Sequence, residues 1–125
     1  MLLDSNIIIY AGKPDYQKIR EFISGIKPAV SAVSYVEVLG YQRLSVKEKK
    51  YYEEFFSLVP VLPLSWEILK KAVEIRQLRK TTLGDSLVAA SALEFNLTLV
   101  TRNVNDFTGI SGLTVLNPFE LNFQD

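Results

Sequence analysis

Five short apolar runs, most of them separated by longer segments of helical periodicity, limit the fold of this chain more than any other feature. The runs cover residues 1–10, 27–34, 59–64, 97–101 and 113–116. Runs this short predict strands, and strands that alternate with helices predict a parallel sheet joined by right-handed crossovers. We therefore expect an α/β chain, a three-layer α/β/α domain with a central, mainly parallel sheet. With 125 residues and 48 % hydrophobic content, the chain fits one such domain, residues 1–125.

Apolar residues recur at helical spacing in the segments between these runs, except in NVNDFTGISG, which we expect to be a loop. Small polar residues stand before most of the segments as candidate N-caps, and Gly25, Pro60 and Asn96 mark three of the ends. The expected helices cover residues 16–25, 35–44, 46–59, 66–80 and 83–95, and the last four follow Ser34, Ser45, Ser65 and Thr82.

The first apolar run, MLLDSNIIIY, contains a carboxylate. Seven of its ten residues are apolar, which predicts a buried strand of a parallel sheet. Burial of a lone ionised carboxylate costs several kcal/mol, so folding alone gives no reason for Asp4. Asp4 is therefore either a functional group at the end of the strand or a buried aspartate with hydrogen bonds in a turn.

Other polar residues fall where the same edge of the sheet would bring them close to Asp4. Thr101, Asn103 and Asp106 follow the fourth apolar run, and functional sites of open α/β sheets lie beyond the carboxyl ends of the strands. Glu37 and Asp85 stand in the first turns of two expected helices. Each also fits a capping box, with Ser34 and Thr82 as the caps, so a structural role is an open alternative for both.

The amino-acid content narrows the chemistry available to such a site. The chain has no cysteine and no histidine, which excludes thiolate catalysis, Cys/His zinc sites and imidazole bases. Neither a Gly-rich turn after the first strand nor a G-x-S-x-G motif is present. Carboxylates about 4 Å apart repel by about 4 kcal/mol at an effective dielectric of 20, so a cluster must hold protons or bind a cation. Oxygen ligands favour Mg²⁺ or Mn²⁺, and a water on such an ion can attack a phosphodiester.

These residues also carry a family resemblance. The start LLDSN, Glu37 in its helix, LGDSLVAASAL with Asp85, and LVTRNVNDF together resemble PIN-domain ribonucleases, most closely the VapC-type toxins of toxin–antitoxin pairs. The similarity covers essentially the full chain in the order of the family. It implies a Mg²⁺- or Mn²⁺-dependent endoribonuclease that cuts single-stranded or looped RNA.

The resemblance also implies roles for individual residues. Asp4 and Asp85 correspond to the principal metal ligands, and Glu37 to a third acid that binds metal or activates water. Asn6 and Thr101 occupy positions of polar groups that support the pocket.

One position departs from the family pattern. The fourth acidic position of the family falls on Asn103, which brings no charge for the binding of a second ion. Asp106 either substitutes for it or caps a loop. The departure leaves open an alternative function, a catalytically impaired PIN-like domain that acts as an RNA- or protein-binding module.

Charge and hydropathy indicate partners and location. Residues 1–80 hold 13 Lys and Arg against 9 Asp and Glu, whereas residues 81–125 hold 1 against 5. Arg76, Arg79 and Lys80 precede the helix of Asp85 and are candidate RNA contacts, or else form a solvated helix end. The resemblance implies a homodimer and a cognate antitoxin. No apolar run is long enough for a bilayer and no export signal is evident, so we expect a cytoplasmic protein without membrane contact.

Overall fold

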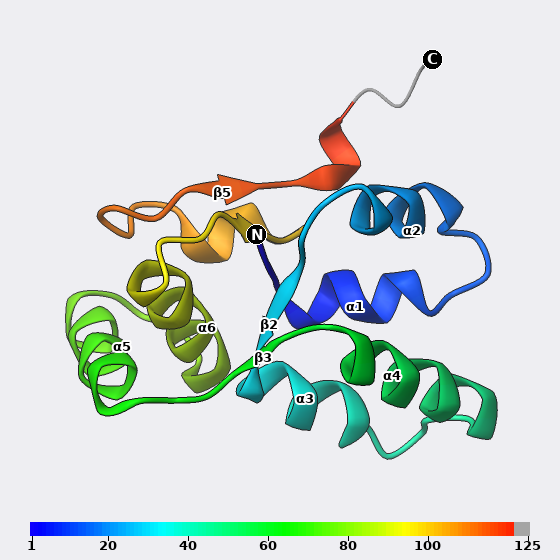
Figure 1. The fold of residues 1–125 in the computed structure, drawn as a ribbon. Coiled ribbons are helices and arrows are strands. Elements are labelled where there is room, and N and C mark those ends of the chain that lie inside the picture. The colour runs from blue at the N-terminus through cyan, green and yellow to red at the C-terminus, as the bar shows by residue number, and fades with distance from the viewer. Residues whose placement is uncertain (122–125) are drawn as a thin grey trace.

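A computed structural model describes residues 1–121 and shows five strands that form one sheet, with helices on both faces (Figure 1). The elements in chain order are β1 (Leu2–Leu3), α1 (Ser5–Ala11), α2 (Gln17–Ser24), β2 (Ala29–Ser31), α3 (Ala32–Leu39), α4 (Val46–Leu58), β3 (Val61–Leu62), α5 (Trp66–Leu78), α6 (Leu83–Glu94), β4 (Leu99–Val100), the 3₁₀ helix η1 (Val104–Phe107), β5 (Val115–Leu116) and the 3₁₀ helix η2 (Pro118–Glu120).

The sheet has the strand order β3-β2-β1-β4-β5, and all four strand pairs are parallel. The predicted α/β class with a parallel central sheet is confirmed. Because β1 pairs in parallel with both β2 and β4, the chain segments after these three strands leave the sheet at the same edge.

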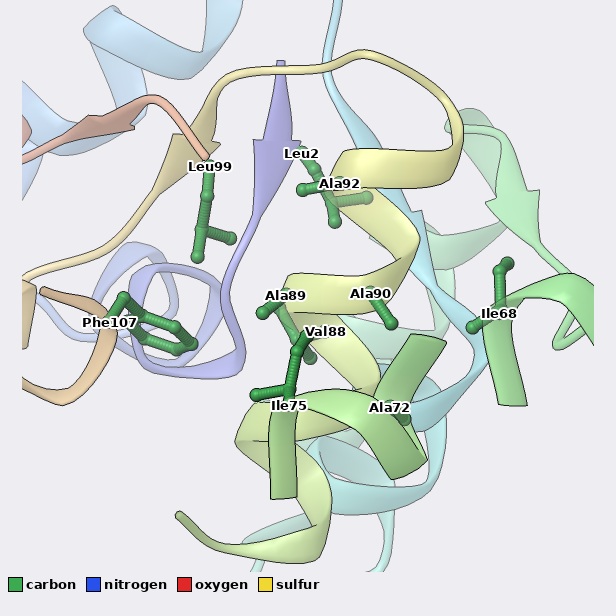
Figure 2. Packing of buried hydrophobic residues seen from close by; sticks show 10 residues of the cluster. All are labelled: Leu2, Ile68, Ala72, Ile75, Val88, Ala89, Ala90, Ala92, Leu99 and Phe107. Carbon is green, nitrogen blue, oxygen red and sulfur yellow. The ribbon is translucent and has the colours of Figure 1, made fainter. Parts of the chain in front are cut away.

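Adjacent residues of the short strands point to opposite faces, which produces two separate cores. Leu2 and Leu99 pack with α5 and α6, whereas Leu3 and Val100 pack with α1 to α4. Figure 2 shows the first core, where alanines of α6 let that helix approach both the sheet and α5 closely. The residues drawn are Leu2, Ile68, Ala72, Ile75, Val88, Ala89, Ala90, Ala92, Leu99 and Phe107.

The prediction for the first apolar run was wrong beyond its third residue. Only Leu2–Leu3 is a strand, and the chain turns at Asp4 into α1, a helix that buries Ile7, Ile8 and Ala11 on one face. The side chain of Asp4 accepts a hydrogen bond from the Ser5 N–H and caps this helix. A short apolar run is equally compatible with a strand and a buried helix, and here packing overrides the strand preference of three consecutive isoleucines.

The predicted start of the second helix was also wrong. The N-cap of α3 is Ser31, whose side chain accepts from the Val33 N–H, and Ser34 is a fully buried residue inside the helix. Glu37 consequently lies in the second turn of α3, and no Ser34 capping box exists. The other predicted caps, Ser45, Ser65 and Thr82, are confirmed. None of the helices in residues 1–121 is long and apolar enough to cross a membrane.

Candidate active site at the edge of the sheet

Two neighbouring strands place the first pair of polar side chains. Asp4 follows β1 and Thr101 follows β4, and these strands pair with Leu3 opposite Val100. The Thr101 hydroxyl donates to Asp4 Oδ2 at 2.8 Å, and both side chains are buried. The parallel pairing therefore brings together residues 97 positions apart in the sequence.

Asp4 is the most deeply buried carboxylate of this edge, with 6 % of its surface exposed. Burial raises its pKa to about 6, against hydrogen bonds from Thr101 and the Ser5 N–H that favour the charged form. The charges of Asp85 and Glu37 raise the pKa further. The Asn6 amide also donates to Asp4 Oδ2, at 3.3 Å, so the carboxylate is held at both oxygens.

Glu37 is fixed by two serines. The Ser5 hydroxyl lies 2.6 Å from Glu37 Oε1 and 2.9 Å from Ser34 Oγ. A hydroxyl carries one hydrogen and an ionised carboxylate only accepts. Ser5 therefore donates to Glu37, and Ser34 donates to Ser5. Ser5 thus contacts Glu37 through its hydroxyl and Asp4 through its backbone N–H. Glu37 Oε2 accepts no hydrogen bond from residues 1–121.

Asp85 enters the site from the first turn of α6. Thr82 Oγ1 accepts from the Asp85 N–H and caps the helix, so the predicted cap and the site residue share one turn. Burial raises the pKa of Asp85, as do the charges of Asp106 and Glu37, whereas a hydrogen bond with Thr82 lowers it. The preceding residue, Gly84, lies so close to Glu37 that a Cβ there would stand 2.7 Å from Oε2.

Asp4, Glu37, Asp85 and Asp106 interact electrostatically. The charges of Asp85 and Glu37 raise the pKa of Asp4, and those of Asp106 and Glu37 raise the pKa of Asp85. In their present side-chain positions, however, no three acidic side chains within residues 1–121 are grouped closely enough to hold one metal ion. The shared ligand set of Asp4, Glu37 and Asp85 therefore stays a prediction.

The supporting residues differ in their roles. Asn6 donates to both Asp4 and Thr101, and its Oδ1 accepts from the Arg102 N–H at 3.4 Å. The backbone N–H of Asn103 donates to Thr101 Oγ1, while its side chain is exposed. Asp106 lies in η1, and its charge raises the pKa of Asp85.

The three predicted RNA contacts are in different situations. Arg79 donates to the backbone carbonyls of Asp106 and Thr108, so this guanidinium is at least partly used to hold the η1 loop. Lys80 lines a pocket of about 370 Å³ together with Asp85 and Asp106. Arg76 is exposed in the last turn of α5 and is not among the residues that line this pocket.

Two features of the site were missed from the sequence. Ser5 and Ser34 orient Glu37, and only the position of Ser5 beside Asp4 hinted at such a role. Arg102, directly after Thr101, was also missed. It is the only Lys or Arg after residue 80, and this isolated charge could have drawn attention to it.

Comparison with known proteins gives one family and several related structures. The PIN domain family model matches residues 1–112. No curated protein matches the chain.

Three solved structures illustrate the similarity. A toxin–antitoxin complex from Klebsiella pneumoniae contains a chain of 28 % identity, with a TM-score of 0.77 over 96 % of this chain and 98 % of that one. VapBC-1 from nontypeable Haemophilus influenzae gives 26 % identity and a TM-score of 0.77 over 95 % and 98 %. VapBC2 from Rickettsia felis, bound to a DNA fragment from its promoter, gives 21 % identity and a TM-score of 0.81 over 93 % and 96 %, a likeness of fold alone.

Proposed function

This chain belongs to the PIN domain family, and from that premise we propose that it is a metal-dependent endoribonuclease and the toxin of a VapBC-type toxin–antitoxin pair. One observation carries the proposal most strongly. Asp4 is buried at the edge of the sheet, within electrostatic range of Glu37 and Asp85, at a cost to stability that folding does not explain.

The donor set fits a hard divalent cation. All candidate ligands are oxygens, the preference of Mg²⁺ and Mn²⁺, and Mg²⁺ needs only one or two protein carboxylates because it keeps several waters. Burial is the main cause of the raised pKa of Asp4, and the charges of Asp85 and Glu37 add to it, so a bound cation would favour the ionised carboxylate. We assign Asp4 and Asp85 as the ligands and Glu37 as a third acid. When bound, the ion would supply an activated water and stabilise charge on the phosphate.

The side chains of the chain itself would position the reacting groups. Thr101, Asn6 and the Ser5 N–H keep the Asp4 carboxylate in one orientation. Ser5 holds Glu37 by Oε1, which leaves Oε2 as the atom that we assign to accept the proton of the attacking water.

Single-stranded or looped RNA is the substrate class that we infer from family membership. Lys80, on the pocket that also contains Asp85, and the exposed Arg76 are the cations that we assign to the RNA backbone. An RNA substrate also implies action in the cytoplasm.

Protein partners follow from the same proposal. The related structures include toxin–antitoxin complexes, and we infer a cognate antitoxin and a homodimer for this chain. Exposed apolar side chains support protein contacts. They include Tyr35, Val36, Tyr41, Trp66 and Val73.

A cleavage assay tests the enzymatic proposal. Purified protein is incubated with 5′-labelled single-stranded RNA, with DNA of the same sequence, and with Mg²⁺, Mn²⁺ or EDTA. We expect cleavage of RNA with either metal and none with EDTA. Asp4→Asn should reduce the rate by about 100-fold or more, since it removes charge on which the site depends.

The exposed Asp15 provides the matched control, because Asp15→Asn removes a carboxylate from the turn after α1, away from the site. Its cleavage rate should equal that of the wild type. A folded wild-type protein that cleaves no RNA with either metal would refute the nuclease and favour the impaired binding module.

A further inference from the structure

Arg102 is held in place by aromatic rings at the edge of the candidate active site. Its guanidinium carbon lies 4.2 Å from the ring centre of Phe119 and 5.0 Å from that of Tyr10. These rings, from η2 and α1, pack edge to face with centroids 5.1 Å apart. The Arg102 N–H donates to Asn6, so the backbone of the residue is tied to the carboxylate network.

Apart from its contacts with the two rings, the Arg102 guanidinium has no ion-pair partner in residues 1–121. The two ion pairs in residues 1–121 join Lys13 to Glu48 and Lys71 to Glu74, and the Arg102 side chain donates no hydrogen bond there. Arg102 is exposed. A guanidinium held in one orientation by aromatic rings can donate bidentate hydrogen bonds to a ligand.

Arg102 forms part of a polar pocket of about 500 Å³. The other polar residues of its lining are Asn103, Asn105, Asp106, Asn117 and Glu120. The volume lies in the roughly 300–1,000 Å³ range of small-ligand sites. Asp106 belongs both to this pocket and to the charge cluster around Asp85, so the two sites adjoin.

The charges of the lining indicate which kind of ligand fits the pocket. The lining contains one cation and two carboxylates, so a phosphate inside the pocket is disfavoured. A nucleobase, in contrast, has hydrogen-bond donors and acceptors on separate edges. Guanine matches best, because Arg commonly binds its O6 and N7 in bidentate fashion. Its N1–H and N2 amine are donors suited to a carboxylate such as Glu120.

We propose that this pocket binds an unpaired guanine of the RNA substrate, with Arg102 on the O6/N7 edge and Glu120 on the N1/N2 edge. The inference rests on the proposed function, since it assigns a base-specific subsite to the same nuclease centre. Unpaired bases are the part of RNA that proteins read in this way.

Fluorescence anisotropy tests the subsite apart from catalysis. The probes are labelled single-stranded RNAs of A and U with one central guanosine, adenosine, inosine or 7-deazaguanosine, measured in EDTA so that no metal-dependent cleavage occurs. Wild-type protein should bind the guanosine probe roughly tenfold more tightly than the adenosine probe. Inosine lacks the N2 amine and 7-deazaguanosine lacks N7, so each should bind less tightly than guanosine.

Variants assign each edge of the base. Arg102→Gln should remove the preference for guanosine over adenosine, and Arg102→Lys should not restore it, because lysine lacks the planar fork. Glu120→Gln should remove the preference for guanosine over inosine. Arg43→Gln is the control, since it removes an exposed arginine from the loop after α3.

The outcomes separate the subsite from the nuclease. Equal binding of all four probes by the wild type overturns the subsite. A uniform loss for every probe in Arg102→Gln also overturns it, because that result indicates a phosphate contact. A protein that cleaves RNA without a guanosine preference refutes only the subsite, whereas one that prefers guanosine but cleaves nothing refutes only the nuclease.

Discussion

Asp4 combines two roles that oppose each other at neutral pH. As the N-cap of α1 it accepts from the Ser5 N–H with Oδ1, which the Oδ1 of an asparagine can also do, while Oδ2 accepts from Thr101 and Asn6. As a buried charge beside Glu37 and Asp85 it destabilises the folded state. The hydrogen bonds explain an acceptor at this position, but not the cost of burying a charge there, which is expected for a site that needs the charge.

The destabilising effect of the Asp4 charge should be measurable in the pH dependence of the free energy of unfolding. The pKa of Asp4 rises from 3.8 when unfolded to about 6 when folded, so the folded state binds the proton more tightly. Stability is therefore lost as the pH increases from about 4 to about 6, by about 3 kcal/mol for this group. Asp4→Asn has no carboxylate to ionise at this position and should not lose this stability. In urea unfolding with EDTA, the free energy of unfolding of the variant should therefore increase relative to that of the wild type as the pH rises from 4 to 7.5.

Magnesium provides the second arm of this experiment. A ligand that binds only the folded state stabilises it, so Mg²⁺ should raise the melting temperature of the wild type and not that of Asp4→Asn. A stability difference between the two proteins that stays constant from pH 4 to pH 7.5 would contradict the burial argument.

At the scale of elements, the site depends on how closely α3 and α6 approach. Gly84 of α6 faces the Glu37 carboxylate of α3 without a side chain between them. Gly84 is the second residue of α6, and its lack of a side chain leaves room for the Glu37 carboxylate.

Gly84→Ala should therefore separate activity from stability. The new Cβ would stand 2.7 Å from Glu37 Oε2 and displace the end of that flexible side chain, while alanine favours the helix. We expect RNA cleavage to fall by about 10- to 100-fold and the melting temperature to stay equal or increase. Gly25→Ala is the control, because a Cβ there meets only ordinary contacts at 3.6 Å or more. Full activity in Gly84→Ala would mean that Glu37 need not occupy this position.

Elements were predictable from sequence where caps and periodicity agreed. Ser45 caps α4 and Thr82 caps α6, as predicted, and the structure adds a capping box between Ser45 and Glu48. The start of the chain was not predictable, because Ile7, Ile8 and Ile9 fit a strand and a buried helix equally. The choice of Ser31 over Ser34 as a cap depends on where β2 ends, and pairing with β1 and β3 decides that.

The candidate site was predictable where strand ends carry it. Asp4 and Thr101 follow paired strands, so topology alone brings them together. The contacts of Ser5 with Glu37 and of Arg102 with Phe119 join segments whose relative rotation depends on packing of the whole chain. No local pattern encodes such contacts, which explains why these residues were missed.

At the scale of the whole molecule, apolar surface remains uncovered on helices that surround the site. Val36 of α3 and Trp66 of α5 are 68 % and 73 % exposed, and both helices pack against α6. Large exposed apolar side chains are typical of protein interfaces. We propose that Val36 and Trp66 contribute to the interface of the homodimer inferred above.

Light scattering after size exclusion tests the assignment. The wild type should have about twice the mass of one chain, and Val36→Glu or Trp66→Glu should shift it toward the mass of one chain, because each buries a charge in the interface. Trp66 is the first residue of α5, where an acid is compatible with the helix. Val46→Glu is the matched control, since Val46 is the exposed first residue of α4. A dimer that survives both interface variants, or is lost only in Val46→Glu, would place the contact on another surface.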